Sequence, residues 1–115
     1  MKFEQKSPPR HFTPAPGIEL QDHGDMFLAP DEQITMVTPR GARMDVAAKK
    51  WGFYATPSMN GRLVNEGFKT ALVQNTKGQI YIMVVERSQA HLFDEYCATE
   101  KQTVLEWLDE RPLFD

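Results

Sequence analysis

The fold is decided by two adjacent runs, Phe68-Lys-Thr-Ala-Leu-Val-Gln-Asn75 and Gln79-Ile-Tyr-Ile-Met-Val-Val-Glu86. Both are rich in β-branched and large apolar residues, which favour strands. The connector between them, Asn75-Thr76-Lys77-Gly78, suits a hairpin turn that closes on a glycine at positive φ. The second run is apolar on both faces, and a strand of that kind is central and covered by helices on at least one side. We therefore expect a paired hairpin in the middle of a sheet.

The stretch before this hairpin predicts a strand followed by a short helix. Trp51-Gly-Phe-Tyr-Ala55 has the aromatic content of a strand, which is either a new strand or the continuation of the preceding one past a bulge at Gly52. Thr56-Pro57-Ser58 indicates a helix start, because threonine can cap the first turn and proline fits the first helical position. Gly67 is expected to end the helix in the left-handed conformation. The helix would span about two to three turns and would bury Met59, Leu63 and Val64.

A second helix and a further segment follow the hairpin. Ser88 suits a cap, and the apolar residues after it recur on one helical face. These residues are Leu92, Phe93, Tyr96 and Cys97. Residues 102–108 leave two alternatives open, because their β-branched members favour a strand, while the absence of glycine and proline before them allows the helix to continue. In the tail, residues 109–115, Leu113 and Phe114 are expected to dock on the domain.

The N-terminal part predicts an arm and another hairpin. Residues 1–17 hold four of the eight prolines, and proline is excluded from helices and central strands, so we expect an extended Pro-rich arm there. The arm would be a poorly ordered terminus or, alternatively, a proline-rich ligand for a partner domain. Ile18–Asp22 alternates as a short edge strand would. Gln33–Thr38 and Arg43–Ala47, joined by a Pro-Arg-Gly turn, suit a hairpin.

Together these elements predict a single α+β domain over residues 18–115. From about residue 51 their order is strand, helix, strand, strand, helix, strand, which is the split β-α-β order of ferredoxin-like folds. The additional N-terminal hairpin precedes this unit, and the extended Pro-rich arm over residues 1–17 lies outside it. Both crossovers would be right-handed, with the two helices on one face of the sheet.

The composition is that of an ordinary globular domain. The chain has 115 residues, 41% of them hydrophobic and 25% charged, with a formal net charge of −3. An acidic balance disfavours nucleic acid and anionic membranes as partners, because phosphate contacts need a basic face. The single cysteine, Cys97, allows no disulfide within the chain. No signal peptide or membrane span is predicted, so we expect a soluble, cytoplasmic protein.

Polar residues around the expected helix start form the candidate ligand site. They are Tyr54, Thr56, Ser58, Asn60, Arg62 and Lys69. The amides of a helix N-terminus attract anions, arginine grips a carboxylate or phosphate with two hydrogen bonds, and hydroxyls orient a ligand. The pattern predicts a site for a small anionic or hydroxylated metabolite. The plainer interpretation is that Thr56 or Ser58 only caps the helix and that Arg62 faces solvent.

Other chemistry has little support in the sequence. The turn Asp22-His23-Gly24-Asp25 offers metal ligands, but the three histidines lack the spacing of known sites, so we predict no metal and no cofactor. Cys97 would lie on the apolar helix face, on the opposite side from His91, which argues against a nucleophile. Lys50–Tyr54 has the aromatic and basic composition of RNA-binding surfaces without their motif order, so no nucleic acid is expected.

The sequence therefore favours a non-catalytic binding or regulatory module that forms a homodimer, because its many aromatic and methionine residues would leave apolar surface open. The alternative is a small enzyme, or an accessory subunit of one, that acts on a polar metabolite at the same site. Arg62 and Lys69 would then stabilise charge, while Tyr54 or Ser58 would move a proton. A third class, a purely structural interaction protein, would use the arm and an edge strand and would have no pocket.

Overall fold

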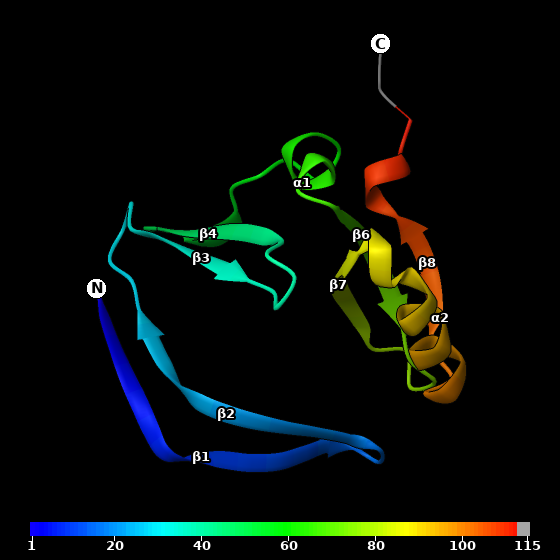
Figure 1. Cartoon of the computed structure of the whole chain (residues 1–115), viewed down its shortest axis with the longest axis horizontal. Helices are drawn as coiled ribbons and strands as arrows, with labels where there is room; N and C mark the ends of the chain where they lie inside the picture. Colours follow the sequence, from blue (N-terminus) through cyan, green and yellow to red (C-terminus); the bar gives the residue numbers. More distant parts are fainter. Residues whose placement is uncertain (113–115) are drawn as a thin grey trace. The chain divides into compact units, whose positions relative to one another are not determined.

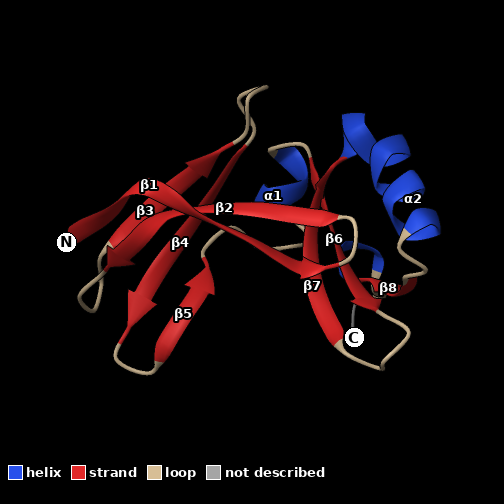
Figure 2. Ribbon diagram, turned by 90° about the horizontal axis from the view of Figure 1, so that it is seen from below, coloured by secondary structure: helices blue, strands red, loops and turns tan. Residues whose placement is uncertain are grey.

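The computed structural model describes residues 1–112, which form a mixed α+β chain in which antiparallel strands predominate (Figure 1). Figure 2 shows that the helices are few and short beside the strands. The chain divides into two compact units, each built from two stretches of sequence. The first unit combines Met1–Ile34 with Val46–Tyr54, and the second combines Thr35–Asp45 with the residues from Ala55 onward.

The first unit opens with a long hairpin of β1 (Lys2–Ala15) and β2 (Ile18–Phe27), which pair antiparallel. The register shifts in two places along β1, and the prolines of the strand, Pro8, Pro9 and Pro14, fall in these interruptions. Proline has no N–H to give to the ladder, so a bulge is where a strand tolerates it. The Pro-rich arm is thus paired with β2 rather than being a free tail, and residue 17 lies in the turn between the strands.

A three-stranded sheet in the order β3-β4-β5 contributes residues to both units. β3 (Gln33–Val37) and β4 (Arg43–Lys49) are joined by a tight turn, in which the Thr38 amide donates to the Ala42 carbonyl at 2.9 Å. The hairpin predicted over these residues is therefore confirmed. β5 (Gly52–Ala55) follows β4 after a two-residue turn and pairs with it.

The main sheet of the second unit has the order β7-β6-β8, and both pairs of strands are antiparallel. β6 (Phe68–Gln74) and β7 (Ile80–Glu86) form the predicted hairpin. Of the two alternatives for residues 102–108, the strand is the correct one, since β8 spans Thr103–Trp107. The prediction that the second strand of the hairpin is the central one is wrong. β8 pairs with β6, so β6 lies in the centre with most of its side chains buried, and β7 lies at the edge.

The first helix is much shorter than the sequence predicts. α1 is a single turn, Arg62–Asn65, so the helix start predicted at Thr56-Pro57-Ser58 is wrong. The chain turns first, because the Ser58 carbonyl accepts hydrogen bonds from the amides of Gly61 and Leu63. Gly61 precedes the helix at φ −133° and ψ −101°, a non-helical conformation that glycine adopts at little steric cost.

The second helical region is built from η1 (Arg87–Gln89), which leads directly into α2 (Ala90–Thr99), and β8 is followed by η2 (Leu108–Glu110). The predicted cap at Ser88 is wrong. Ser88 lies inside η1, and neither η1 nor α2 has a side-chain hydrogen bond at its cap. The reason is that η1 begins immediately after β7, so the helical conformation has already started at Ser88.

Helix α2 contacts the sheet through a limited part of its predicted apolar face. The ring of Phe93 packs edge-on against Trp107 of β8, with 5.6 Å between the ring centroids. Leu92, from the same predicted face, is 51% exposed. The helix contains no fully buried residue, which indicates that it covers the sheet only loosely.

The elements from β5 onward follow the predicted order, but the four-stranded ferredoxin-like sheet is not formed among residues 1–112. That sheet would need β5 beside the strands of the β7-β6-β8 sheet, whereas β5 pairs with β4. The two-residue turn makes β4 the nearest partner, and strands that follow one another in sequence usually pair. β5 is also short, with four residues beginning at Gly52, which further favours pairing with the adjacent β4.

The apolar core of the second unit is small. Its buried apolar side chains are Pro57, Leu63, Phe68, Ala71, Val73 and Val85, and Thr70 of β6 is buried as well. In the part of the chain that the structure describes, no helix has the length and apolar character needed to cross a membrane. Leu113 and Phe114, for which docking is predicted, lie outside the described residues.

Candidate functional site

Part of the predicted site assembles around the carboxylate of Asp45 in β4. Arg62 Nη1 lies 3.0 Å from Asp45 Oδ2, and Thr35 Oγ1 donates to Asp45 Oδ1 at 2.6 Å. The Thr56 hydroxyl accepts from Arg62 Nη2 at 3.4 Å, and the Thr56 amide donates to the Asp45 carbonyl at 3.0 Å. Ser58 Oγ accepts from the Arg62 amide at 3.2 Å. We call these five residues the Asp45 cluster.

The Asp45 cluster holds its carboxylate in the ionised form. The pKa of Asp45 lies below its ordinary value, first because the Thr35 hydroxyl donates to the carboxylate and second because the Arg62 guanidinium donates to it. The Asp45 side chain is 17% exposed and that of Arg62 is 50% exposed. The charge of Arg62 is thus offset inside the protein, which weakens its attraction for an anion.

We expect acid to destabilise the second unit through Asp45. Its folded pKa is lower than the ordinary 3.8, so its contribution is complete above that value and is lost as the pH falls through the folded pKa. Asp45→Asn should lower the melting temperature at pH 7. It should also make the melting temperature fall less steeply as the pH is lowered from about 5 to about 2. Circular-dichroism melts over this range test this, with Asp94→Asn on the exposed side of α2 as the control. Equal slopes in Asp45→Asn and the parent protein would contradict the assignment.

Two other predicted residues lie outside the Asp45 cluster. Tyr54 belongs to the first unit, where its ring stacks on Trp51 with 5.8 Å between centroids. The Lys69 ammonium pairs with Glu110 at 3.1 Å and lies 4.1 Å from the centre of the Trp107 ring. Lys69 therefore has an acidic and an aromatic partner of its own, and it does not join the guanidinium of the Asp45 cluster.

The longer helix whose N-terminal amides were predicted to attract an anion is not formed, because α1 is a single turn, which aligns few peptide dipoles. Asn60 lies exposed in the turn before it. Sequence reasoning missed Asp45 and Thr35, which provide the main partners of the cluster. The signal that could have found Asp45 is the alternation in β4, where this acidic residue stands between Met44 and Val46.

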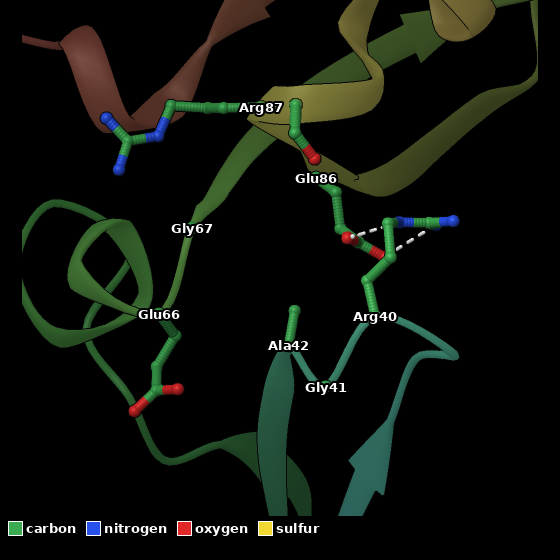
Figure 3. A pocket seen from close by; sticks show the side chains of 8 residues that line it. Arg40, Gly41, Ala42, Glu66, Gly67, Glu86 and Arg87 are labelled. Carbon is green, nitrogen blue, oxygen red and sulfur yellow. Dashed lines mark hydrogen bonds and ion pairs between the residues drawn. The ribbon is translucent and has the colours of Figure 1, made fainter.

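A second polar site, which the sequence did not indicate, is an open depression of about 600 Å³ beside the end of β7 (Figure 3). Arg40 Nε and Nη2 each lie 2.9 Å from an oxygen of the Glu86 carboxylate. The Glu86 side chain is 9% exposed. In Figure 3 the Arg87 side chain points away from this pair. Its Nη2 donates to the Val64 carbonyl at 2.7 Å.

The charges around the depression balance one another, since two arginines and two glutamates line it. The pKa of Glu86 lies below its ordinary value because Arg40 donates to it and, second, because Thr38 donates to it. This bidentate pair ties the turn between β3 and β4 to the end of β7. We therefore interpret the Arg40–Glu86 pair in this depression as a structural contact, and the depression is not interpreted as an anion-binding site.

The described residues show no arrangement typical of nucleophilic or metal chemistry. Burial raises the pKa of the Cys97 thiol, and the nearby charge of Asp94 raises it further. A thiol with a raised pKa is a poor nucleophile at neutral pH. Over residues 1–112, no three His, Cys, Asp or Glu side chains lie close enough together to hold a metal ion.

The most distinctive surface is the start of β7, which carries three consecutive exposed apolar side chains. Ile80 is 57% exposed, Tyr81 44% and Ile82 69%. The sheet order β7-β6-β8 leaves one edge of β7 on the outside. Residues 80–85 include no charged residue, glycine or proline. We call residues 80–85, with this outer edge, the β7 edge.

Comparison of the chain with protein-family models, with curated proteins and with solved structures gives no match.

Proposed function

We propose that the chain is a non-catalytic binding or regulatory module that works as a homodimer. The observation that carries this proposal is the distribution of apolar side chains. Over residues 1–112, sixteen large apolar side chains are at least 40% exposed, whereas the large apolar side chains that are buried are Leu63, Phe68, Val73 and Val85. Among them, Ile80, Tyr81 and Ile82 are consecutive, and a contiguous exposed apolar patch of this kind is characteristic of an interaction site.

A small polar ligand at the Asp45 cluster is the second part of the proposal. The half-exposed Arg62 guanidinium and the neighbouring hydroxyls of Thr56 and Ser58 support it. Because Asp45 offsets the charge of Arg62, a hydroxylated or weakly anionic metabolite suits the cluster better than a phosphate does. The proposal places the module in the cytoplasm, where a free thiol such as that of Cys97 is stable.

One experiment with two readouts tests the proposal. Sedimentation equilibrium of the full chain should give a mass that approaches twice that of one chain as the concentration rises to high micromolar. In a melting-temperature screen of hydroxylated and carboxylated metabolites, a ligand at 100 times its dissociation constant adds about 2.7 kcal/mol. Arg62→Ala should abolish that shift, while Arg111→Ala, at an exposed ion pair with Glu106, should keep it. A strict monomer would contradict the homodimer, and a screen without a shift would contradict the ligand.

A further inference from the structure

We infer that the homodimer forms by antiparallel pairing of the β7 edge with the β7 edge of a second copy, an inference that rests on the proposed function. β7 is hydrogen-bonded to β6 along one side. On its other side, alternate N–H and C=O groups point outward, as in any edge strand. Such an edge gains its missing hydrogen bonds when another strand is added to the sheet.

The other strands carry features that oppose this kind of pairing. β1 is interrupted by prolines, β2 has acidic residues along its length, and β3 and β5 are short. β8 contains Glu106, which is held by Arg111 at 2.8 Å. Charges, prolines and short length are the usual protections of an edge strand. The β7 edge has none of them between Ile80 and Val85, so it is the edge best suited to receive a strand.

A second copy fits the β7 edge because the segment is complementary to itself. With the two-fold axis at Ile82, this residue lies opposite its own copy, Ile80 lies opposite Val84, and Tyr81 lies opposite Met83. Every directly opposite pair from 80 to 84 is then apolar on apolar. Pairs of this kind stabilise antiparallel strands, and no like charges are placed opposite each other within the paired segment.

Neighbouring registers are less suitable. With the axis at Met83, Ile80 would lie opposite Glu86, a carboxylate that Arg40 already holds in a bidentate ion pair. With the axis at Tyr81, the paired part of β7 would shrink to residues 80–82, since the turn begins before Ile80. The register centred on Ile82 therefore gives a five-residue run of apolar pairs and, unlike the register centred on Met83, places no carboxylate opposite an apolar side chain. It joins the two sheets into one continuous sheet in the order β8-β6-β7-β7-β6-β8.

Substitution at the axis tests the pairing. Ile82→Lys places two ammonium groups opposite each other, and like charges that face each other across an interface cost several kcal/mol, so we expect it to raise the dissociation constant of the dimer at least about 100-fold, as measured by sedimentation equilibrium. Ile82 is 69% exposed, so the monomer should keep its fold, which a circular-dichroism melt checks. Leu105→Lys is the matched control. Leu105 lies on the β8 edge and is 47% exposed, so this substitution should leave the dimer intact.

Cross-linking tests the register independently of stability. In a Cys97→Ser background, which has no other cysteine, Ile82→Cys should be joined into a covalent dimer by a short bismaleimide. Leu105→Cys in the same background should stay monomeric on a denaturing gel. A dimer that Ile82→Lys leaves intact, or that cross-links through position 105, would overturn this inference while leaving the homodimer in place. A parent protein that is monomeric at high micromolar concentration would overturn both.

Discussion

Leu63→Ala is expected to lower the free energy of unfolding of the second unit by about 2–5 kcal/mol. Leu63 is 1% exposed and is the buried residue of the single turn α1. Removing its side chain forfeits apolar burial and leaves a cavity in a core that has few other large apolar side chains. Because domains are stable by only about 5–15 kcal/mol, this change is a large fraction of the total.

The effect of Leu63→Ala can be read from a single tryptophan. The chain has two tryptophans, and Trp51→Phe leaves Trp107, in β8, as the reporter of the second unit. The melting temperature should fall by roughly 4 °C for each kcal/mol lost. Leu92→Ala, on the exposed side of α2, is the control and should change stability by less than about 0.5 kcal/mol. Equal effects of the two substitutions would show that Leu63 is not part of the core.

Thr70→Val is expected to act in the opposite direction and to raise the free energy of unfolding by about 1–3 kcal/mol. Thr70 is 2% exposed, and its Oγ1 has no hydrogen-bond partner among residues 1–112. A buried hydroxyl without a partner has lost its hydration and gained nothing in return. The Thr70 amide donates to Asp109 Oδ1 at 3.0 Å, and valine keeps that bond because the backbone is unchanged.

The comparison of Thr70→Val with Thr70→Ser isolates the hydroxyl. Serine keeps the unpaired hydroxyl and loses the methyl group, so we expect Thr70→Ser to be less stable than the parent protein. Chemical denaturation followed by Trp107 fluorescence in the Trp51→Phe background measures both variants on the same scale. A Thr70→Val protein that is less stable than its parent would mean that the hydroxyl has a partner in solution.

Strand content could be predicted from the sequence because its causes are local. The two confirmed hairpins, over residues 33–49 and 68–86, combine β-branched runs with turn residues at the right spacing. The identity of the central strand could not be predicted, because the pairing of β8 with β6 brings together segments separated by α2. The pairing of β5 was also predicted wrongly. The sequence order suggested a distant partner in the β7-β6-β8 sheet, whereas the short turn after β4 makes β4 the partner of β5.

In the candidate site, too, the residues close together in the sequence could be predicted and the distant one could not. Thr56, Ser58 and Arg62 were brought together by proximity in the sequence, and the structure places them in one cluster. Asp45, the residue at the centre of that cluster, is 17 positions from Arg62, and its role depends on how β4 lies against the turn before α1. Thr56-Pro57-Ser58 suits a helix start and a turn equally well, so local chemistry alone could not decide between them.

The interrupted ladder of β1 also bears on how far association can proceed. Wherever a proline replaces a hydrogen-bonding residue, an incoming chain finds no amide to bind, so this ribbon is a poor template for stacking more copies. A two-fold contact through β7 consumes the same surface on both molecules and leaves no equivalent surface for a third. On the dimer proposed here, the chain should therefore stop at a closed pair and resist growth into fibrils, even at concentrations where exposed apolar strands commonly polymerise.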